Sequence, residues 1–114
     1  MNLIYRKTWT VASTGTPWGT TRYSKTAGAT AILTFTGTDI GWVSSRGPKR
    51  GKARVYIDGA LAQVVDLHSS TTQVRKIVFV ASGMVAGQHT IKIYVNGTMG
   101  RPRVDIDGFI VLSQ

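Results

Sequence analysis

The chain has 114 residues, the length of one ordinary domain, and it contains no cysteine, which excludes disulfides and thiolate metal sites. Its 14 Lys and Arg against 5 acidic residues, all of them Asp, give a net charge of +9. That charge favours anionic partners without choosing among them. No stretch of about 18 apolar residues and no signal-peptide pattern occurs, so we expect no membrane span, and whether Met1 is a native start stays open.

The first quarter of the chain predicts one strand and one long connection. Residues 3–11 (LIYRKTWTV) alternate, with Tyr5, Lys7 and Trp9 on one face, and are interpreted as the first strand. Residues 13–29 are rich in Gly, Ser and Thr, which is typical of a connection or an irregular edge. We therefore expect regular sheet structure to resume only after residue 29.

The next segments predict strands joined by tight turns. Residues 30–37 (TAILTFTG) alternate cleanly, with the apolar side chains inward, and residues 39–45 (DIGWVSS) follow as a second strand. Residues 53–69 are the clearest hairpin, because Asp58-Gly59 supplies the positive φ angles of a two-residue primed turn.

The last third adds three further strand signals. Residues 72–83 (TQVRKIVFVASG) are apolar on both sides in their middle, as in a central strand. Residues 89–98 alternate and end in Asn96-Gly97, a second turn signal. In residues 101–113, Val104 and Ile106 point inward and Gly108 marks a bulge.

About eight short strands and no substantial helix predict an all-β fold. The chain is interpreted as a single domain over residues 1–114, an antiparallel two-sheet β-sandwich of the jelly-roll type. The expected core consists of Leu33, Phe35, Trp42, Val55, Ile57, Val65, Ile77, Phe79, Ile91, Ile93, Val104 and Ile106.

The segment SSRGPKRGKAR places five cations between Arg46 and Arg54. Arg46, Lys49, Arg50 and Lys52 could hold carboxylate, sulfate or phosphate groups, or they could be turn chemistry that pairs internally with an Asp. We expect Arg46, Lys49 and Arg50 on a turn between the third and fourth strands, with at least two of them in water. Lys49 and Arg50 are expected to be free for a partner, and Arg54 to be tied to an Asp.

Aromatic residues form a second candidate site. Trp18 and Tyr23 lie in the polar segment, where a ring has little core to fill, and sugar rings stack on such side chains. The alternative is that Trp18 caps the open end of the sandwich. Trp9 and Trp42, within alternating strands, are expected in the core.

Several pieces of the chain, among them FTGTDIGWVSSRGPKRGKARVYIDG, SGMVAGQHTIKI and RVDIDGFIV, resemble a module found at the ends of secreted bacterial glycan-acting enzymes and surface proteins. These modules are galactose-binding-like jelly rolls regarded as non-catalytic carbohydrate-binding domains. The resemblance implies a polysaccharide ligand and an extracellular or cell-surface location, while the charge suggests acidic glycans. Related modules often hold a structural calcium ion, for which Asp105 and Asp107 are the candidates here, although no acidic residue precedes Asp39.

Other functions are less favoured than polysaccharide binding. Asp105 and Asp107, roughly 7 Å apart on one strand face, could flank a glycosidic bond, but ion pairing with nearby arginines is the favoured interpretation. His68 and His89 have no nucleophile motif beside them, so no enzyme is expected. The main alternative is a structural protein of a phage virion or cell-surface appendage, with protein neighbours on polar strand edges such as residues 3–11. Nucleic-acid binding is less favoured, because its recognisable motifs are absent.

Overall fold

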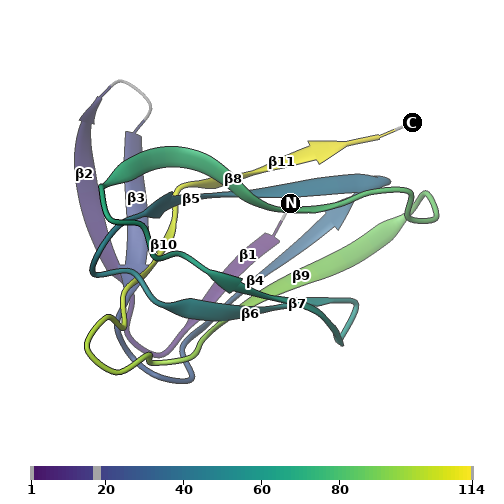
Figure 1. Cartoon of the computed structure of the whole chain (residues 1–114). Coiled ribbons are helices and arrows are strands. Elements are labelled where there is room, and N and C mark those ends of the chain that lie inside the picture. Colours follow the sequence, from purple (N-terminus) through teal and green to yellow (C-terminus); the bar gives the residue numbers. More distant parts are fainter. Residues whose placement is uncertain (1, 17–18, 114) are drawn as a thin grey trace.

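The fold is all-β, as predicted, and the computed structural model describes residues 2–16 and 19–113 (Figure 1). The described residues form eleven strands, where eight were expected. They are β1 (Asn2–Arg6), β2 (Thr10–Thr16), β3 (Gly19–Ser24), β4 (Thr30–Thr36), β5 (Asp39–Arg46), β6 (Lys52–Ile57), β7 (Ala60–Asp66), β8 (Gln73–Ala81), β9 (Gln88–Val95), β10 (Val104–Ile106) and β11 (Gly108–Leu112).

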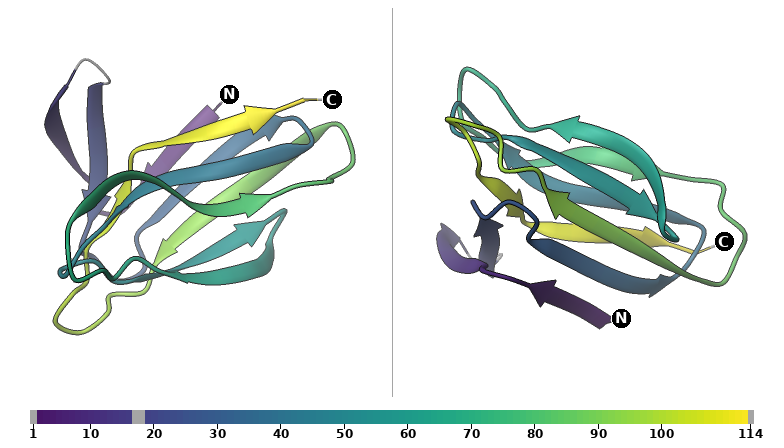
Figure 2. Two further views of the ribbon diagram at one scale, coloured as in Figure 1. Left: turned by 45° about the horizontal axis from the view of Figure 1, so that its top comes forward. Right: turned by 90° about the horizontal axis from the view of Figure 1, so that it is seen from below.

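The strands form three sheets rather than two, and every strand pair in them is antiparallel. One layer is a five-stranded sheet of order β1-β4-β9-β6-β7. The opposite layer is divided between a sheet of order β11-β5-β8 and a sheet of order β10-β3-β2. Figure 2 shows the five-stranded sheet running from β7 to β1 and the β2–β3 hairpin standing away from the rest. The sandwich prediction is thus confirmed, with its second layer split.

The core lies between the five-stranded sheet and the sheet that contains β5. Trp42 and Phe35 are its largest fully buried side chains. Ten of the twelve predicted core residues are buried. Ile57 is only partly buried against the core, and Ile77 is 56% exposed, so its core assignment is wrong. Strict alternation in β4 and β9 explains why the prediction works best there.

The N-terminal segment differs from the prediction. Lys7 has a φ of 64°, which ends β1 and prevents residues 3–11 from forming one strand. The segment expected as a long connection instead contains the β2–β3 hairpin, in which Thr10 pairs with Tyr23. Trp9 is half-buried and packs against the core, as expected. Polar β-branched threonines formed strands here despite a turn-like composition.

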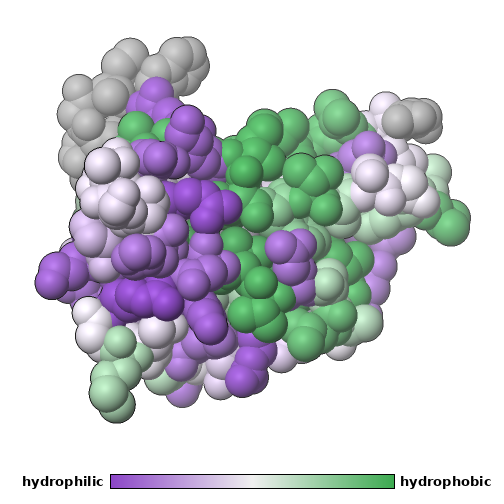
Figure 3. Space-filling model, viewed as in Figure 1, coloured by the Kyte–Doolittle hydropathy of each residue, from purple (hydrophilic) through white to green (hydrophobic). Residues whose placement is uncertain are grey.

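Strand β8 lies at a sheet edge rather than at a sheet centre. Its pairing with β5 is interrupted by two irregularities, and Val74, Ile77 and Val80 are 62%, 56% and 60% exposed. Figure 3 shows a hydrophobic area in the middle of that view, where β8 crosses, beside a hydrophilic area at the end with β10. The second apolar face of β8 is therefore surface, not core.

Both turn signals are confirmed by the backbone. Asp58 and Gly59 have φ values of 51° and 85°, as a primed hairpin turn requires. Gly97 has a φ of 74° and passes so close to Ala27 that a Cβ at this position would lie 2.5 Å from its Cβ. Within the described part of the chain, no helix is long and apolar enough to cross a membrane.

Candidate functional site

The basic segment forms a turn between β5 and β6 that is fixed by backbone hydrogen bonds. The Gly47 amide donates to the Leu67 carbonyl at 3.0 Å, and the Leu67 amide donates to the Gly51 carbonyl at 3.0 Å. The Gly51 amide donates to the Arg103 carbonyl at 2.9 Å. The segment is therefore a rigid part of the sandwich end, joined to the residues that follow β7 and precede β10.

Asp105 is the centre of the charge cluster at this end. Its side chain is 1% exposed, and each of its two oxygens accepts hydrogen bonds from two arginines. Arg50 Nε donates to Oδ1 at 3.1 Å, and Arg103 Nε and Nη2 donate at 2.9 and 3.0 Å. Hydrogen bonding to Asp105 raises the pKa of Arg103. A carboxylate buried this deeply needs such partners, because an unpaired charge in the interior is costly.

A second carboxylate holds the other side of the same turn. Arg101 makes a two-pronged contact with Asp66, with distances of 2.7 and 3.3 Å from Nη1 and Nη2 to the two carboxylate oxygens. Hydrogen bonding from Arg101 lowers the pKa of Asp66. Arg46 Nη1 donates to the Asp66 backbone carbonyl at 2.6 Å. Arginines from the turn itself and from the segment before β10 thus fasten the turn to the sheets.

These contacts correct several predictions about the basic segment. Of Arg46, Lys49 and Arg50, only Lys49 is exposed, so the expectation that two of the three point into water is wrong. Arg50 is not free for a partner, because Asp105 binds it. Arg54 is not tied to an Asp, since its guanidinium carbon lies 5.2 Å from the ring centroid of Tyr94.

The predicted aromatic site is only partly described. Tyr23 is half-buried and its ring is covered by Arg103, whose guanidinium carbon lies 3.9 Å from the ring centroid. Trp18 lies outside the described residues. Lys52, the remaining candidate, is exposed. The backbone amide of Lys52 donates a hydrogen bond to Thr98 Oγ1 at 2.9 Å, so only the side chain of Lys52 can contact a ligand.

Asp105 and Asp107 do not fit a calcium site as they are placed. Two guanidinium groups occupy the oxygens of Asp105, and a calcium ion there would meet two positive charges. Asp107 accepts hydrogen bonds from the hydroxyls of Thr21 and Ser45, the latter at 2.9 Å. Among residues 2–16 and 19–113, no group of three or more His, Cys, Asp or Glu side chains could hold a metal ion.

His89, at the start of β9, joins the turn between β6 and β7 to the loop between β8 and β9. Its Nδ1 lies 2.6 Å from Asp58 Oδ2, and its Nε2 lies 2.6 Å from the Val85 carbonyl oxygen. Both neighbours are acceptors, and the Val85 carbonyl, followed by Asp58, raises the pKa of His89. The hydrogen bond from His89 lowers the pKa of Asp58. This arrangement is a structural latch, as expected of a histidine without a nucleophile beside it.

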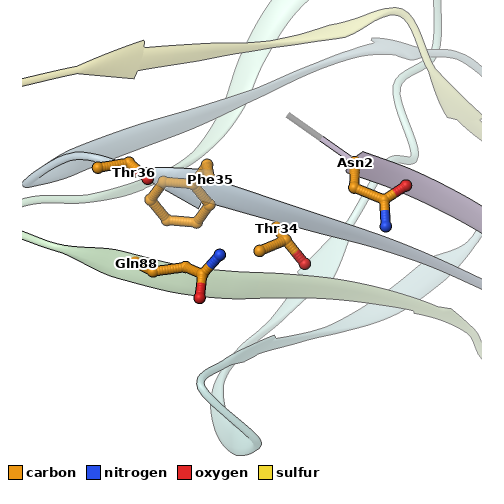
Figure 4. A pocket seen from close by; sticks show the side chains of 5 residues that line it. All are labelled: Asn2, Thr34, Phe35, Thr36 and Gln88. Atoms are coloured by element: carbon orange, nitrogen blue, oxygen red, sulfur yellow. The ribbon is translucent and has the colours of Figure 1, made fainter.

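A pocket of 490 Å³ opens near this end of the sandwich, lined by Asn2, Thr34, Phe35, Thr36 and Gln88 (Figure 4). Figure 4 shows the side chains of Thr34, Asn2 and Gln88 along the rims of neighbouring strands. The lining contains amides and hydroxyls but no charged side chain, so the pocket offers neutral hydrogen-bonding groups and no acid–base pair.

Sequence reasoning missed a set of side chains on the outer face of the five-stranded sheet. There Tyr56 pairs with Lys92 and Tyr94 pairs with Arg54 across β6 and β9. Lys92 Nζ lies 4.5 Å from the Tyr56 ring centroid. A signal was present in the sequence, because both strands are predicted, and in each of them an outward cation is followed two residues later by an outward tyrosine.

The chain is similar in sequence to parts of two much longer enzymes. It is 35% identical over 114 residues to "A type blood N-acetyl-alpha-D-galactosamine deacetylase" of Flavonifractor plautii, covering 99% of this chain and 14% of the relative. It is 36% identical over 89 residues to "A type blood alpha-D-galactosamine galactosaminidase" of the same organism, covering 78% of this chain and 8% of that protein. The chain therefore corresponds to a small part of each enzyme.

The fold is also that of known carbohydrate-binding modules. A CBM36 module solved in complex with calcium and xylotriose superposes with a TM-score of 0.55 at 12% identity, covering 96% of this chain and 98% of that one. The predicted resemblance to carbohydrate-binding modules is thus confirmed for the fold. The IPT/TIG domain family matches residues 20–105, most of the chain, and the protein therefore belongs to the IPT/TIG domain family.

Proposed function

We propose that the chain is a non-catalytic carbohydrate-binding module that attaches a larger protein to a polysaccharide outside the cell or at the cell surface. The observation that carries this proposal is that the chain resembles parts of two enzymes whose names state different reactions, a deacetylase and a galactosaminidase. A domain that occurs in enzymes with different reactions is more simply explained by a task that both enzymes share, and contact with the glycan is such a task.

The carboxylates support a non-catalytic role. Glycoside hydrolysis needs two carboxyl groups that face a sugar and can exchange protons. Here Asp58, Asp66, Asp105 and Asp107 are all engaged by side chains or backbone amides of the protein. Asp39 has one buried oxygen without a hydrogen-bond partner, and it is the remaining Asp of the chain. No two of them are placed as a free pair.

The predicted ligand residues differ in whether they are free to contact a glycan. Lys49 and Lys52 are exposed and can contact a glycan directly. Arg46, Arg50 and Tyr23 already have protein partners, so they would act mainly by holding the turn in shape. The net charge of +9 favours glycans that carry carboxylate or sulfate groups.

A glycan array tests the proposal. The protein is applied to neutral glycans, glycans that end in N-acetylgalactosamine or galactosamine, and uronic or sulfated glycans, at low and at moderate salt. Retention that discriminates among glycans at moderate salt supports the module. Retention that is lost with salt and does not discriminate reflects net charge alone. The absence of retention on every glycan contradicts the proposal.

A second candidate is a structural component of a larger assembly, such as a virion or a cell-surface appendage. One observation favours it: Ile77, Val80, Ile110 and Leu112 are between 46% and 60% exposed on β8 and β11, the two edge strands of the β11-β5-β8 sheet. An apolar face of this kind can bury itself against a protein neighbour. Sedimentation at increasing concentration distinguishes this role, because a module that is monomeric throughout and binds glycan does not need self-assembly.

A further inference from the structure

The outer face of the five-stranded sheet carries two neighbouring rows of side chains. The pairing of β6 with β9 places Arg54 opposite Tyr94 and Tyr56 opposite Lys92. Side chains alternate across a strand, so these four lie on the face opposite to the buried Val55. They therefore share one solvent-facing surface of the five-stranded sheet.

The four residues form a chequered pattern in which the two tyrosines lie on one diagonal and the two cations on the other. Lys92 Nζ lies 4.5 Å from the ring centroid of Tyr56, and the guanidinium carbon of Arg54 lies 5.2 Å from the ring centroid of Tyr94. Diagonal neighbours across a strand pair are about 7–8 Å apart. The face thus offers two aromatic rings and two cations at a regular spacing.

The two rows of side chains that hold this pattern contain no acidic residue. The other positions of the two rows are Arg6, Thr30, Val64, Ile4, Ile32 and Leu61. The nearest acids along the strands are Asp58, held by His89, and Asp66, held by Arg101. Among the described residues, neither Arg54 nor Lys92 forms an ion pair with a carboxylate. Their charge is therefore available to a ligand.

The contacts between cations and rings can be exchanged for contacts with an anion. A cation–π contact at an exposed site is weaker than a hydrogen bond to a charged group. A carboxylate or sulfate can thus draw Lys92 or Arg54 toward itself, which uncovers ring surface. That surface can then pack against the C–H face of a sugar.

We propose that this face, defined by Arg54, Tyr56, Lys92 and Tyr94, binds a polysaccharide chain that carries carboxylate or sulfate groups. Tyr56 and Tyr94 pack under sugar rings, and Arg54 and Lys92 bind the anionic groups. The proposal rests on the proposed glycan-binding function but places the site on the sheet face, away from the β5–β6 turn. The complementarity is one of charge: three cations and no acid line the two rows.

Binding to defined polymers tests this placement. The probes are polygalacturonate, a sulfated galactosamine-containing glycan, a neutral galactan and single-stranded oligothymidylate, each titrated calorimetrically at two salt concentrations. The variants are Y56A with Y94A, and R54Q with K92Q. K49Q tests the turn, and K76Q, at an exposed lysine on β8, is the control for the loss of one positive charge away from this face. Thermal melting checks that each variant is folded.

The expected result is that the wild type binds the two anionic glycans more tightly than the galactan and the oligonucleotide. R54Q with K92Q should lower that affinity about tenfold or more and flatten its salt dependence. Y56A with Y94A should lower it by a similar factor, while Y56F with Y94F keeps it. K76Q should leave it unchanged.

Three other outcomes overturn the placement in distinguishable ways. If K49Q alone weakens binding to glycan, the site is at the turn, and the glycan-binding function stands without the sheet face. If the wild type prefers oligothymidylate, the face binds nucleic acid instead. If the folded wild type binds no glycan at all, the proposed function itself fails.

Discussion

The guanidinium of Arg50 binds the carboxylate of Asp105 at 3.1 Å, although 55 residues separate them in the chain. Arg103 completes the contact from the other side, so that a nearly fully buried carboxylate faces two cations. This relationship turns the most basic stretch of the sequence into an internal support of the sandwich. Its consequences for stability can be measured.

D105N should strongly destabilise the fold. The change leaves Arg50 and Arg103 half-buried without their counter-charge, and breaking a buried pair typically costs about 3–5 kcal/mol. Urea unfolding followed by tryptophan fluorescence measures this loss. K49A, at an exposed position of the same turn, is the control and should change the free energy of unfolding by less than about 0.5 kcal/mol. Equal small effects of both changes would contradict the supporting role of Asp105.

G51A should also destabilise the fold, for a reason of space. A Cβ at residue 51 would collide with the Arg101 carbonyl oxygen and lie 2.9 Å from Thr98 Cβ, and the first of these atoms is backbone. Overpacking of this kind costs about 1–3 kcal/mol. G59S, placed in the exposed primed turn with open space around it, separates the effect of crowding from that of backbone strain. Thermal melting of the two variants should show the larger loss for G51A.

The His89 latch should make stability depend on pH. The pKa of His89 is raised in the folded state, so its contribution is fully present below the unfolded pKa of about 6.5 and is lost as the pH rises through the folded pKa. The pKa of Asp58 is lowered, so its contribution is lost as the pH falls through that lowered value. Melting temperatures should be measured from below the lowered pKa of Asp58 to above the raised pKa of His89. The melting temperature should decline as the pH rises through the pKa of folded His89, and H89Q should remove that decline. An unchanged profile in H89Q would show that other groups cause it.

Calcium should not alter the stability of this protein. The oxygens of Asp105 are occupied by guanidinium groups, and Asp107 is held by two hydroxyls. Melting in millimolar calcium and again in excess chelator should give the same midpoint within about 1 °C. A reproducible rise with calcium that disappears in D107N would mean that the side chains around Asp107 rearrange to bind the ion.

The parts of the fold that sequence reasoning predicted well are those in which one face of a strand is buried and the other is not. The alternation of β4 and β9 identified Leu33, Phe35, Ile91 and Ile93 as core, and Asp58-Gly59 fixed a hairpin. The prediction that β8 is a central strand failed, because the sequence alone does not show whether an apolar residue such as Val80 lies in a core or on the surface.

The candidate site was harder to predict than the fold. The density of charge in residues 46–54 suggested a binding loop, but charge in a sequence does not reveal which Asp lies beside it in space. Asp105 comes from a strand far along the chain, and it is brought to Arg50 by the pairing of β10 with β3 and by the backbone hydrogen bond from Gly51 to Arg103. The tyrosine and cation pairs of β6 and β9 needed the strand register as well.

The place of the last strands has a consequence for the order in which the molecule can fold. Strands β10 and β11 pair with β3 and β5, and they leave the ribosome long after them. Until residues 104–112 arrive, Trp42 lacks part of its cover, Arg50 lacks its carboxylate, and two strands have open edges. Pairings so distant in sequence form slowly. The nascent chain therefore stays incomplete until synthesis of this segment ends, and truncation before residue 104 should yield a protease-sensitive, aggregation-prone product.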